Sequence, residues 1–435
     1  MIQVKNKTAF HYSISKMILK GWAADTMTYA KAEKAIIHGR LIVPDESKQG
    51  DFAEKEGTVL FYNEKIGAIV PASEAAEGLR ECAEVLDAAG KYVAPGFLNV
   101  HIHGCGGSDA MDGAPASLAV MQEMQARSGV TGFLPTTMTC AREDIARALD
   151  AVREAMHGSN ARGARVLGAH LEGPFINPIY KGAQAEKHII PADFSLLAPY
   201  RDVVKIATFA PEMLRGGWSF ARKCRDAGIV LSIGHSAADY DVAREAIVRH
   251  GISHITHAFN AMAPLHHRKP GILGAAMESG VNCELITDNV HVHPAMQRLL
   301  WQAKGGQHVI LITDSLRPTG LGDGPSELGG QEIFVKGTRA TLADGTLAGS
   351  VLLMDAAIRN FRQNTGAALP DVIACVTKTP AEDLGIYKEC GSLEPGKRAD
   401  IAILDDDLQI AATIVGGRTV YMNGNKIAPL TRVPC

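Results

Sequence analysis

The sequence lacks an excess of charge of either sign, since 44 Lys and Arg residues stand against 47 Asp and Glu residues and give a net charge of -3. It therefore has no basic surface of the kind that nucleic acids and other polyanions require. It also lacks any apolar run of about 18 residues, the length of a membrane-spanning helix. With 46% hydrophobic and 21% charged residues, the composition is that of a globular protein with a substantial core.

Paired cysteine motifs and a secretion signal are missing as well. The eight cysteines are scattered without a Cys-x-x-Cys pair, which fits reduced thiols in the cytosol. Residues 1–30 contain no apolar segment followed by a small-residue cleavage site. We therefore expect a cytoplasmic protein without structural disulfides. Residues 1–30 have no clear periodicity and are expected to be an arm that is disordered, an added strand, or a result of the choice of start site.

Apolar segments alternate with amphipathic ones from residue 97 onward. The segments that we expect to be strands are 97–103, 130–137, 166–172, 203–209, 229–235, 254–259, 283–287 and 309–313. Helical spacing of apolar residues lies between most of them, as in 142–156, 218–227, 240–249 and 294–303. Apolar strands that alternate with helices are typical of parallel strands buried on both faces. Because the strands number eight and no Gly-x-Gly-x-x-Gly follows the first, the pattern predicts an α/β protein with a (β/α)8 TIM-like barrel.

Segments with strand-like alternation flank the predicted barrel on both sides. They are 35–43 and 58–70 before it, and 399–404 and 413–422 after it. Because neither pair could bury a face alone, we expect one small β-sandwich built from both termini. The predicted limits are 31–95 and 386–435 for the two parts of the sandwich and 96–385 for the barrel. A Gly-rich region at 317–349 follows the last barrel strand, where a lid or substrate loop is expected.

Metal-binding residue types recur at the ends of the predicted strands. His101 and His103 close the first strand, and positions i and i+2 of a strand share a face. Later strands end at Glu172, His235, His257 and Asp314. In a barrel, the carboxyl ends of the strands surround one mouth, so these side chains should converge there. Imidazole and carboxylate groups bind zinc and other divalent first-row metals, and we predict that the four histidines and Glu172 are the ligands.

Asp314 completes the predicted hydrolytic site. A divalent metal lowers the pKa of bound water toward about 7, and a nearby carboxylate can carry the released proton. Zinc is the expected metal, and iron, manganese and cobalt accept the same ligand types.

Other candidate residues have structural interpretations. Single histidines on apolar strands are more often hydrogen-bonded core residues than ligands, and we interpret His170, His254 and His308 in that way. Cys105 is expected to pack as a small hydrophobic side chain, and Met262 and Met277 as packing residues. Six metal-binding residues stand at the ends of five different strands much more rarely by accident than as parts of a functional site.

Seven short segments carry a resemblance that covers nearly the whole chain. They are PGFLNVHIHGCGG at 95–107, HLEGPF at 170–175, GHS at 234–236, THAFNAM at 256–262, DNVH at 288–291, TD at 313–314 and GSLEPGKRAD at 391–400. On these segments the chain resembles enzymes of the amidohydrolase superfamily, and specifically the N-acetylglucosamine-6-phosphate deacetylases of amino-sugar catabolism. The second and fourth segments are fairly specific to these deacetylases.

The resemblance implies roles at the reacting centre. Glu172, His235 and His257 match metal ligands of the family, Asp314 matches its catalytic acid/base, and His291 matches a histidine that contacts substrate near the scissile amide. Some members lack the first histidine pair and hold one metal. Because this chain has the pair, the resemblance implies one or two divalent ions per subunit.

The resemblance also implies roles at the phosphate. Asn260 and Ala261 match a phosphate-contacting turn. Arg268 matches an arginine that binds the phosphate of the neighbouring subunit's substrate, which implies a homodimer. A guanidinium suits a phosphate dianion, and the alternative for Arg268 is a solvated surface charge.

Three positions depart from the family pattern. Gln184 stands in the substrate region where some members have a histidine, so contacts to the sugar differ there. Asn289 replaces a glycine, and asparagine tolerates a left-handed backbone better than most residues. Ser315 adds a hydroxyl next to Asp314. These departures leave the galactosamine-6-phosphate derivative open as the alternative substrate.

The implied reaction is hydrolytic N-deacetylation, which releases acetate and an amino-sugar phosphate. In it, Asp314 accepts the proton of the attacking water and gives it to the leaving amine, while His291 and the metal stabilise the oxyanion. An alternative of the same fold is a cyclic amidohydrolase or deaminase. Many of those bridge two metals with a carboxylated lysine, a role that falls here to Glu172. A noncatalytic metal-binding scaffold is the alternative outside the enzymes, although a scaffold has no need for Asp314.

Overall fold

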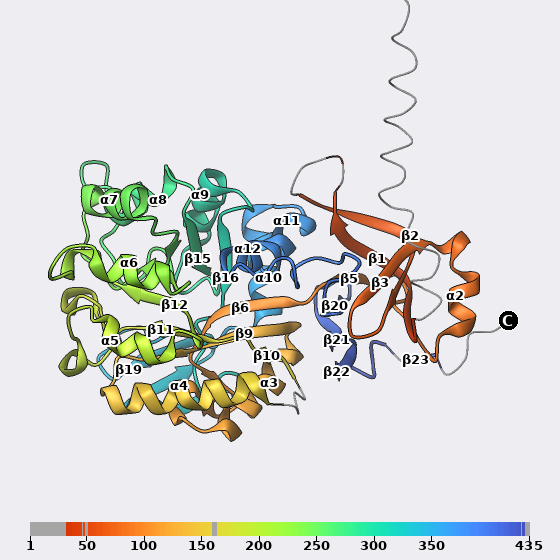
Figure 1. The fold of residues 1–435 in the computed structure, drawn as a ribbon, viewed down its shortest axis with the longest axis horizontal. Coiled ribbons are helices and arrows are strands. Elements are labelled where there is room, and N and C mark those ends of the chain that lie inside the picture. Colours follow the sequence, from red (N-terminus) through yellow and green to blue (C-terminus); the bar gives the residue numbers. More distant parts are fainter. Residues whose placement is uncertain (1–31, 46, 48–50, 159–162, 428, 431–435) are drawn as a thin grey trace, which may run out of the picture.

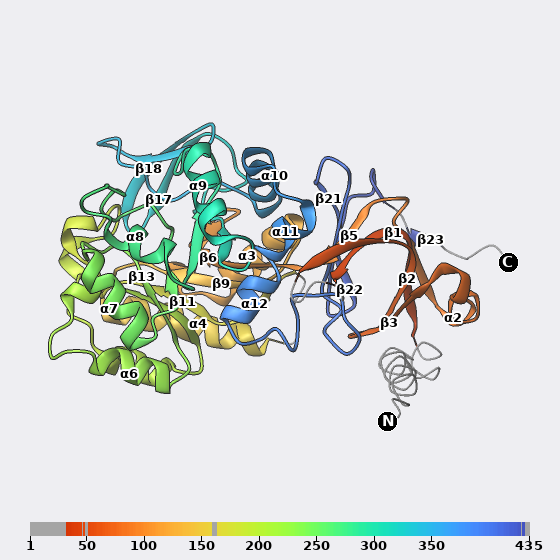
Figure 2. The same ribbon diagram turned by 90° about the horizontal axis from the view of Figure 1, so that it is seen from above.

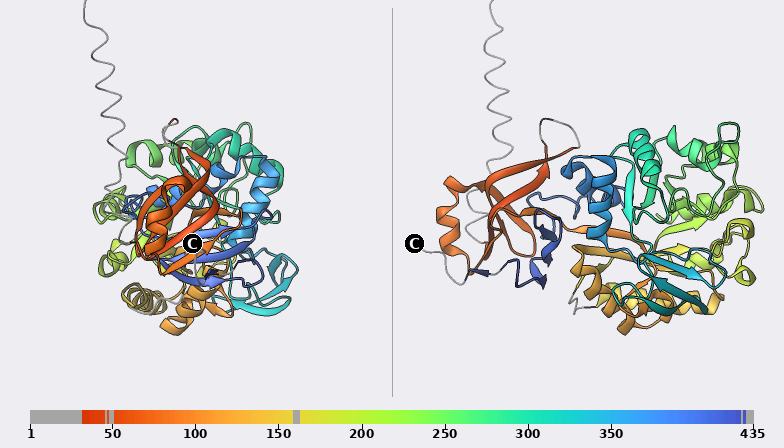
Figure 3. Two further views of the ribbon diagram at one scale, coloured as in Figure 1. Left: turned by 90° about the vertical axis from the view of Figure 1, so that its right-hand side faces the viewer. Right: turned by 180° about the vertical axis from the view of Figure 1, so that it is seen from behind.

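The computed structural model describes residues 32–45, 47, 51–158, 163–427 and 429–430. The arm predicted at residues 1–30 lies outside this part of the chain. A barrel and a separate sheet lie side by side (Figure 1), and the view from behind shows the same division (Figure 3).

Eight parallel strands form the barrel, as the sequence predicts. They are β6 (Phe97–Ile102), β9 (Val130–Thr137), β11 (Ala169–Glu172), β12 (Val204–Phe209), β13 (Val230–Ile233), β14 (His254–Ile255), β15 (Asn282–Ile286) and β16 (Val309–Ile312). The strands from β9 to β16 pair in sequence order, β6 pairs with the other edge of β9, and the short β10 (Arg165–Val166) also pairs with β9. All eight residues of β9 are buried, so its sequence does not alternate between apolar and charged residues, and its polar residues are threonines.

The barrel closes where β16 meets β6. The backbone N–H of Asp314 donates to the carbonyl of His101, and that of His103 donates to the carbonyl of Ser315, both at 3.0 Å. These two bonds fix Asp314 beside the histidine pair.

Helices cover the outside of the barrel. They are α3 (Pro115–Arg127), α4 (Arg142–His157), α5 (Phe194–Leu197), α6 (Ser219–Asp226), α7 (Tyr240–His250), α8 (Gly271–Met277), α9 (Pro294–Lys304), α10 (Met354–Thr365), α11 (Leu369–Ala374) and α12 (Lys378–Asp383). The helices α4, α6, α7 and α9 lie within one residue of the predicted limits. In α4, Ile145, Leu149 and Val152 are buried at spacings of four and three residues. Each such side chain contributes about 1.5–3 kcal/mol by burial, so Leu149→Ala should loosen this helix most directly.

The separate sheet is built from both ends of the described chain, as predicted. Its strands are β1 (Lys34–Pro44), β2 (Phe52–Tyr62), β3 (Ile66–Pro71), β4 (Glu84–Asp87), β5 (Tyr92–Pro95), β20 (Ile401–Leu404), β21 (Ile410–Val415), β22 (Arg418–Met422) and β23 (Pro429–Leu430), with the helix α2 (Ala76–Glu81) beside them. The two ends meet where β20 pairs antiparallel with β5. Each of the segments 58–70 and 413–422 contains two strands, because turns at 63–65 and at Gly416-Gly417 divide them.

A small antiparallel sheet follows the last barrel strand. It consists of β17 (Gly324–Leu328), β18 (Gln331–Lys336) and β19 (Arg339–Leu342), and it lies on the barrel away from the separate sheet (Figure 2). Its buried residues Leu328, Ile333 and Val335 pack in one cluster with Met138 and Leu316. A further pair of two-residue strands, β7 (Gly104–Cys105) and β8 (Ser108–Asp109), follows β6. In the described ranges no helix is both long and apolar enough to cross a membrane, and the cysteines there are free.

Candidate metal centre

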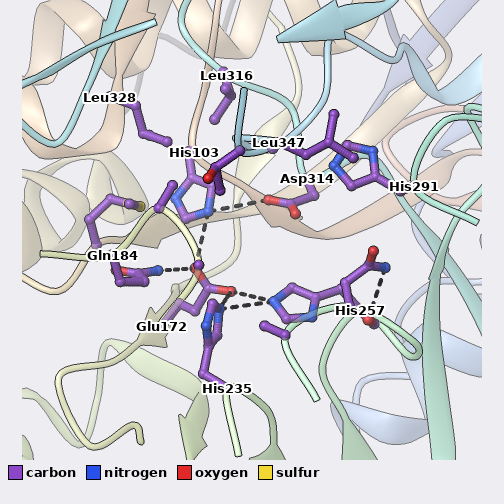
Figure 4. A pocket seen from close by; sticks show the side chains of 17 residues that line it. His103, Glu172, Gln184, His235, His257, His291, Asp314, Leu316, Leu328 and Leu347 are labelled. Carbon is purple, nitrogen blue, oxygen red and sulfur yellow. Dashed lines mark hydrogen bonds and ion pairs between the residues drawn. The ribbon is translucent and has the colours of Figure 1, made fainter. Parts of the chain in front are cut away.

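The five predicted ligands converge at the carboxyl ends of the barrel strands, and Figure 4 labels His103, Glu172, His235 and His257 among them. Glu172, the last residue of β11, lies at the centre. Its Oε1 is 3.3 Å from His101 Nε2, 3.2 Å from His235 Nε2 and 3.0 Å from His257 Nε2, and its Oε2 is 3.3 Å from His103 Nε2. All five residues are buried. The donors fall into two groups that share Glu172, one with His101 and His103 and the other with His235 and His257.

Three of the predicted site residues have unusual backbone conformations. His235, His257 and Asp314 have φ angles of +47°, +27° and +48°, in or near the left-handed region that non-glycine residues rarely adopt. Each is the second residue after the end of its barrel strand. Such strain concentrates at functional sites, where the surrounding structure holds it in place. The conformation turns the side chain at the strand end toward the mouth.

The hydrogen bonds that the histidine rings make at Nδ1, away from Glu172, determine whether Nε2, which faces Glu172, has a lone pair. His235 Nδ1 donates to the Tyr180 carbonyl at 2.8 Å, and His103 Nδ1 donates to the Thr136 carbonyl at 3.2 Å. A carbonyl can only accept, so Nδ1 carries a proton in both rings, and whenever such a ring is neutral its Nε2 faces Glu172 with a lone pair. His101 Nε2 is completely buried and has no hydrogen-bond partner in the described structure. A cation bound among these atoms would satisfy every one of them, so the residues fit a divalent metal.

The electrostatics of the cluster lead to the same conclusion. Burial alone lowers the pKa of His103, but hydrogen bonds to Asp314 and Glu172 outweigh it and raise the pKa to about 10. Burial alone raises the pKa of Glu172, but the charges of His101 and His235 hold it well below its ordinary value. The carboxylates thus demand positive charge inside the cluster. Protons on the imidazoles can supply it, and a metal ion that displaces those protons can supply it too.

Asp314 lies on the open side of the cluster. Its Oδ1 is 3.4 Å from His101 Nε2 and 3.3 Å from His103 Nε2, and the residue is 7% exposed. Burial raises its pKa, but the charge of His101 and the hydrogen bond from His103 outweigh this and lower it. The side chain is therefore an ionised carboxylate that faces both the cluster and the pocket.

His291 reaches the same pocket from the loop after β15. Its Nδ1 lies 2.7 Å from Asp288 Oδ2, and the carboxylate also accepts the backbone N–H of His291 at 2.8 Å. The ring is thereby fixed, with Nε2 left for a ligand in the pocket. Between them Asn289 has a φ of +65°, which is the left-handed conformation that the sequence argument requires of it.

The pocket above the cluster is a cavity of about 300 Å³. Polar residues form its floor and one side, including His103, Glu172, Asp314, His291 and Asn260, and Ala261 lies next to Asn260 in the lining. Met138, Leu316, Leu328 and Leu347 form an apolar wall. This size suits a small molecule with both polar and apolar parts.

Gln184 and Arg268, two further predicted substrate residues, differ in their position relative to this pocket. Gln184 lines the pocket, but its Nε2 donates to Glu172 Oε2 at 2.6 Å and its Oε1 accepts the backbone N–H of Thr139 at 2.7 Å. It therefore orients the shared carboxylate. Arg268 is exposed, contacts His267 Nε2 at 2.6 Å and does not line this pocket.

The residues with structural interpretations are buried or half-buried. His170 bonds to the Val100 carbonyl at 3.1 Å and to Thr208 Oγ1 at 2.8 Å, and His308 Nδ1 lies 3.1 Å from Asn282 Oδ1. Cys105 is fully buried, and its burial raises the pKa of its thiol to about 12. The Ser315 hydroxyl bonds to Thr313 Oγ1 at 3.0 Å.

One acidic residue near the cluster escaped the sequence analysis. Glu284, in the middle of β15, is completely buried, and its Oε2 accepts from His101 Nδ1 at 2.9 Å. The sequence did contain a signal for Glu284, because an acidic residue inside the apolar segment 282–286 would be buried, and a buried carboxylate needs charged or hydrogen-bonded partners.

Comparisons with known proteins agree with this geometry. The sequence profile described as the amidohydrolase family matches residues 92–420, so the chain belongs to the amidohydrolase family. Within that family it is 39% identical over 347 residues to the N-acetylglucosamine-6-phosphate deacetylase of Bacillus subtilis (strain 168), with 78% of this chain and 87% of that protein covered. The predicted resemblance to these deacetylases is confirmed.

A second curated relative and a solved structure are also similar to this chain. The N-acetylgalactosamine-6-phosphate deacetylase of Escherichia coli O157:H7 is 35% identical over 334 residues, with 75% of this chain and 87% of that protein covered. The crystal structure of N-acetylglucosamine-6-phosphate deacetylase from Thermotoga maritima has a TM-score of 0.78 and 32% identity, and covers 89% of this chain and 100% of that chain.

Proposed function

We propose that this protein is a divalent-metal-dependent hydrolase that removes the acetyl group of an N-acetylated amino-sugar 6-phosphate, with N-acetylglucosamine-6-phosphate as the substrate. The observation that carries the proposal is the convergence of four histidines on Glu172, next to an ionised Asp314, at the floor of an open pocket. Relatives of 39% and 35% identity that match 78% and 75% of the chain are deacetylases of such sugars.

The metal would be held by Glu172, His235 and His257, with a second ion at Glu172, His101 and His103. When bound, a divalent metal polarises an amide carbonyl and lowers the pKa of water toward about 7. Zinc is the metal that we propose, because nitrogen-rich sets with one carboxylate suit it.

The residues of the chain perform the proton and positioning steps. Asp314 accepts a proton from the attacking water and donates it to the leaving nitrogen, since its carboxylate faces the cluster and the pocket. His291 is held at Nδ1 by Asp288 and faces the carbonyl oxygen with Nε2, and with both ring nitrogens protonated it donates from Nε2 as negative charge develops on that oxygen. Gln184 holds Glu172 in place.

The phosphate end of the substrate would lie at Asn260 and Ala261. Ala261 has a left-handed φ of +49° in the turn after His257 and lines the pocket beside Asn260. We propose that Arg268 of a second subunit completes this end in a cytoplasmic homodimer, because Arg268 is exposed and off its own pocket. A guanidinium binds a phosphate dianion in a bidentate manner.

The test is acetate release by the zinc-loaded protein from N-acetylglucosamine-6-phosphate and from its galacto epimer, each beside its unphosphorylated sugar. The proposal predicts hydrolysis of a phosphorylated sugar, faster with the gluco epimer, and little from the controls. Faster turnover of the galacto epimer would assign the chain to the alternative substrate, which the relative at 35% identity supports. Inactivity toward both phosphorylated sugars would reject the proposed reaction.

A further inference from the structure

Glu284 lies behind the metal centre and is bound to both of its halves. The carboxylate is completely buried within β15, and its Oε2 accepts from His101 Nδ1 at 2.9 Å and from the backbone N–H of His257 at 3.0 Å. It therefore contacts the ring of one candidate ligand and the backbone of another.

The second oxygen of Glu284 is part of a longer buried chain of contacts. Glu284 Oε1 is 3.0 Å from His254 Nε2, and His254 Nδ1 is 2.8 Å from Asp383 Oδ2 at the end of α12. Asp383 Oδ1 accepts from Asn282 Nδ2 at 2.6 Å. The side chains of Glu284, His254 and Asp383 are all at least 98% buried.

The number of available N–H donors determines the charge of the buried group formed by Glu284, His254 and Asp383. A neutral imidazole has one N–H, yet both ring nitrogens of His254 face carboxylate oxygens that can only accept while ionised. His254 is therefore an imidazolium. Burial alone lowers its pKa, but Asp383 and Glu284 outweigh this and raise it to about 10. Two carboxylates and one imidazolium leave one net negative charge directly behind His101.

This charge distinguishes His101 from the other three histidines of the centre. His103 and His235 are held at Nδ1 by neutral backbone carbonyls, and His257 Nδ1 has no hydrogen-bond partner in the described structure. A carboxylate behind a ligating histidine fixes the ring and makes its other nitrogen a stronger donor. Only the site formed by His101, His103 and Glu172 contains a ring supported in this way.

We propose that Glu284, held from behind by His254 and Asp383, is the positioning residue of His101 and thereby sets the affinity of the His101–His103–Glu172 site for the second metal ion. The inference rests on the proposed function only in taking these residues to bind divalent metal. It assigns a role to two residues, His254 and Asp383, that lie outside the pocket lining.

The test compares Glu284→Gln with the unmodified protein by metal binding alone. Glutamine keeps the shape of the side chain and an oxygen for His101 and His257, but removes the charge. Metal-free protein is titrated with Zn²⁺ against a chromophoric chelator, bound ions are counted by mass spectrometry, and the Co²⁺-loaded form is examined by visible absorption. We expect two ions in the unmodified protein, and in E284Q a second-site affinity that is about 10–100-fold weaker with the first site unchanged.

Two further variants keep the test decisive. Asp383→Asn touches no candidate ligand and should weaken the second site in the same direction by a smaller factor, so it replaces E284Q if that variant does not fold. Asp400→Asn is the matched control, because it removes a buried carboxylate of the separate sheet that bonds to the backbone N–H of Gly416. We expect D400N to leave both sites and the Co²⁺ spectrum unchanged.

Three outcomes would overturn the inference: a single ion in the unmodified protein, equal weakening of both sites in E284Q, or unmodified second-site affinity and spectrum in the folded variants. Since no substrate is used, the result is independent of the proposed reaction. A protein that binds two ions as described and releases no acetate would reject the reaction and leave the role of Glu284 intact.

Discussion

Glu172 and Glu284 are two buried glutamates on opposite sides of the His101 ring, and their surroundings differ in one respect. His101 Nδ1 is 2.9 Å from Glu284 and His101 Nε2 is 3.3 Å from Glu172. The three hydrogen-bond partners of the Glu284 carboxylate can all donate to it: the imidazoles of His101 and His254 and the backbone N–H of His257. The neighbours of Glu172 include the Nε2 atoms of His103 and His235, which have lone pairs in the neutral rings because Nδ1 donates to a carbonyl, and His235 Nε2 is 3.0 Å from His257 Nε2.

The difference separates a structural network from a candidate metal centre. A buried carboxylate with enough donors is complete without a ligand. A buried carboxylate that faces lone pairs requires protons or a cation, and only this one opens on a pocket. The number of histidines near each glutamate does not show this difference, whereas the direction of each hydrogen bond does.

The largest expected effect comes from Asp314→Asn, which removes a proton acceptor at the open side of the Glu172 cluster. We expect kcat for acetate release to fall about 10²–10⁴-fold with little change in KM, because the amide cannot accept the proton of water. Steady-state kinetics measure this, with metal content determined in parallel. Unchanged turnover at full metal content would contradict the assigned proton transfer.

Chelation should affect the Glu172 cluster and spare the Glu284 network. Removal of metal should abolish acetate release and lower the free energy of unfolding by about 2.7 kcal/mol per site when the free ion had been at 100 times its Kd. Urea unfolding with and without chelator measures the change, and added Zn²⁺ should restore both properties. Full activity in the chelated protein would mean that the cluster works without a metal.

Arg268→Ala tests whether the Glu172 cluster belongs to a pocket that a second subunit completes. A hydrogen bond to a charged group contributes about 1.5–3 kcal/mol, so KM should rise about 10–100-fold with the metal content unchanged. Mixing R268A with D314N subunits should recover activity, since one pocket of the mixed dimer has both an intact Asp314 and the arginine of its partner. No recovery in an exchanged dimer would place Arg268 in its own subunit's pocket or outside the site.

The smallest expected effect is at the ion pair of Arg317 and Asp112, which lies outside the pocket lining, because water competes for its charges. Arg317 Nη2 lies 2.5 Å from Asp112 Oδ1, with both side chains about one quarter exposed. Burial alone raises the pKa of Asp112, but the Arg317 hydrogen bond outweighs it and lowers the pKa. The pair therefore stabilises the fold above the unfolded pKa of about 3.9, and this contribution is lost as the pH falls through the lower folded pKa.

Asp112→Asn should cost less than about 1 kcal/mol of unfolding free energy at pH 7. The difference from the unmodified protein should disappear in acid, as urea titrations at the two pH values would show. A larger loss, or one that persists in acid, would contradict the small contribution assigned to the pair of Arg317 and Asp112.

The sequence predicted the barrel and the convergence of the candidate ligands because both depend on local patterns. Fully buried strands require continuous apolar runs, and their last residues, such as Glu172, lie at one end of the barrel whatever the loops do. The segment 254–259 shows the limit of this argument, since the strand there ends at Ile255 and His257 reaches the centre from a strained loop. Periodicity contains no information about such a turn.

The network behind His101 could not be predicted in the same way. Its members Glu284, His254 and Asp383 are separated by up to 129 residues, and Asp383 lies on a helix that the sequence analysis did not identify. His254 was assigned correctly as a hydrogen-bonded core residue, but its partners depend on how α12 packs under the barrel. The contact of Gln184 with Glu172 likewise depends on the path of a loop.

The most direct test of the account is anomalous diffraction from crystals of the zinc-loaded protein at the zinc absorption edge. The account predicts one peak among Glu172, His235 and His257 and a second among Glu172, His101 and His103, with Asp314 facing both. Peaks at other residues, or no peak in this cluster at full metal content, would contradict it.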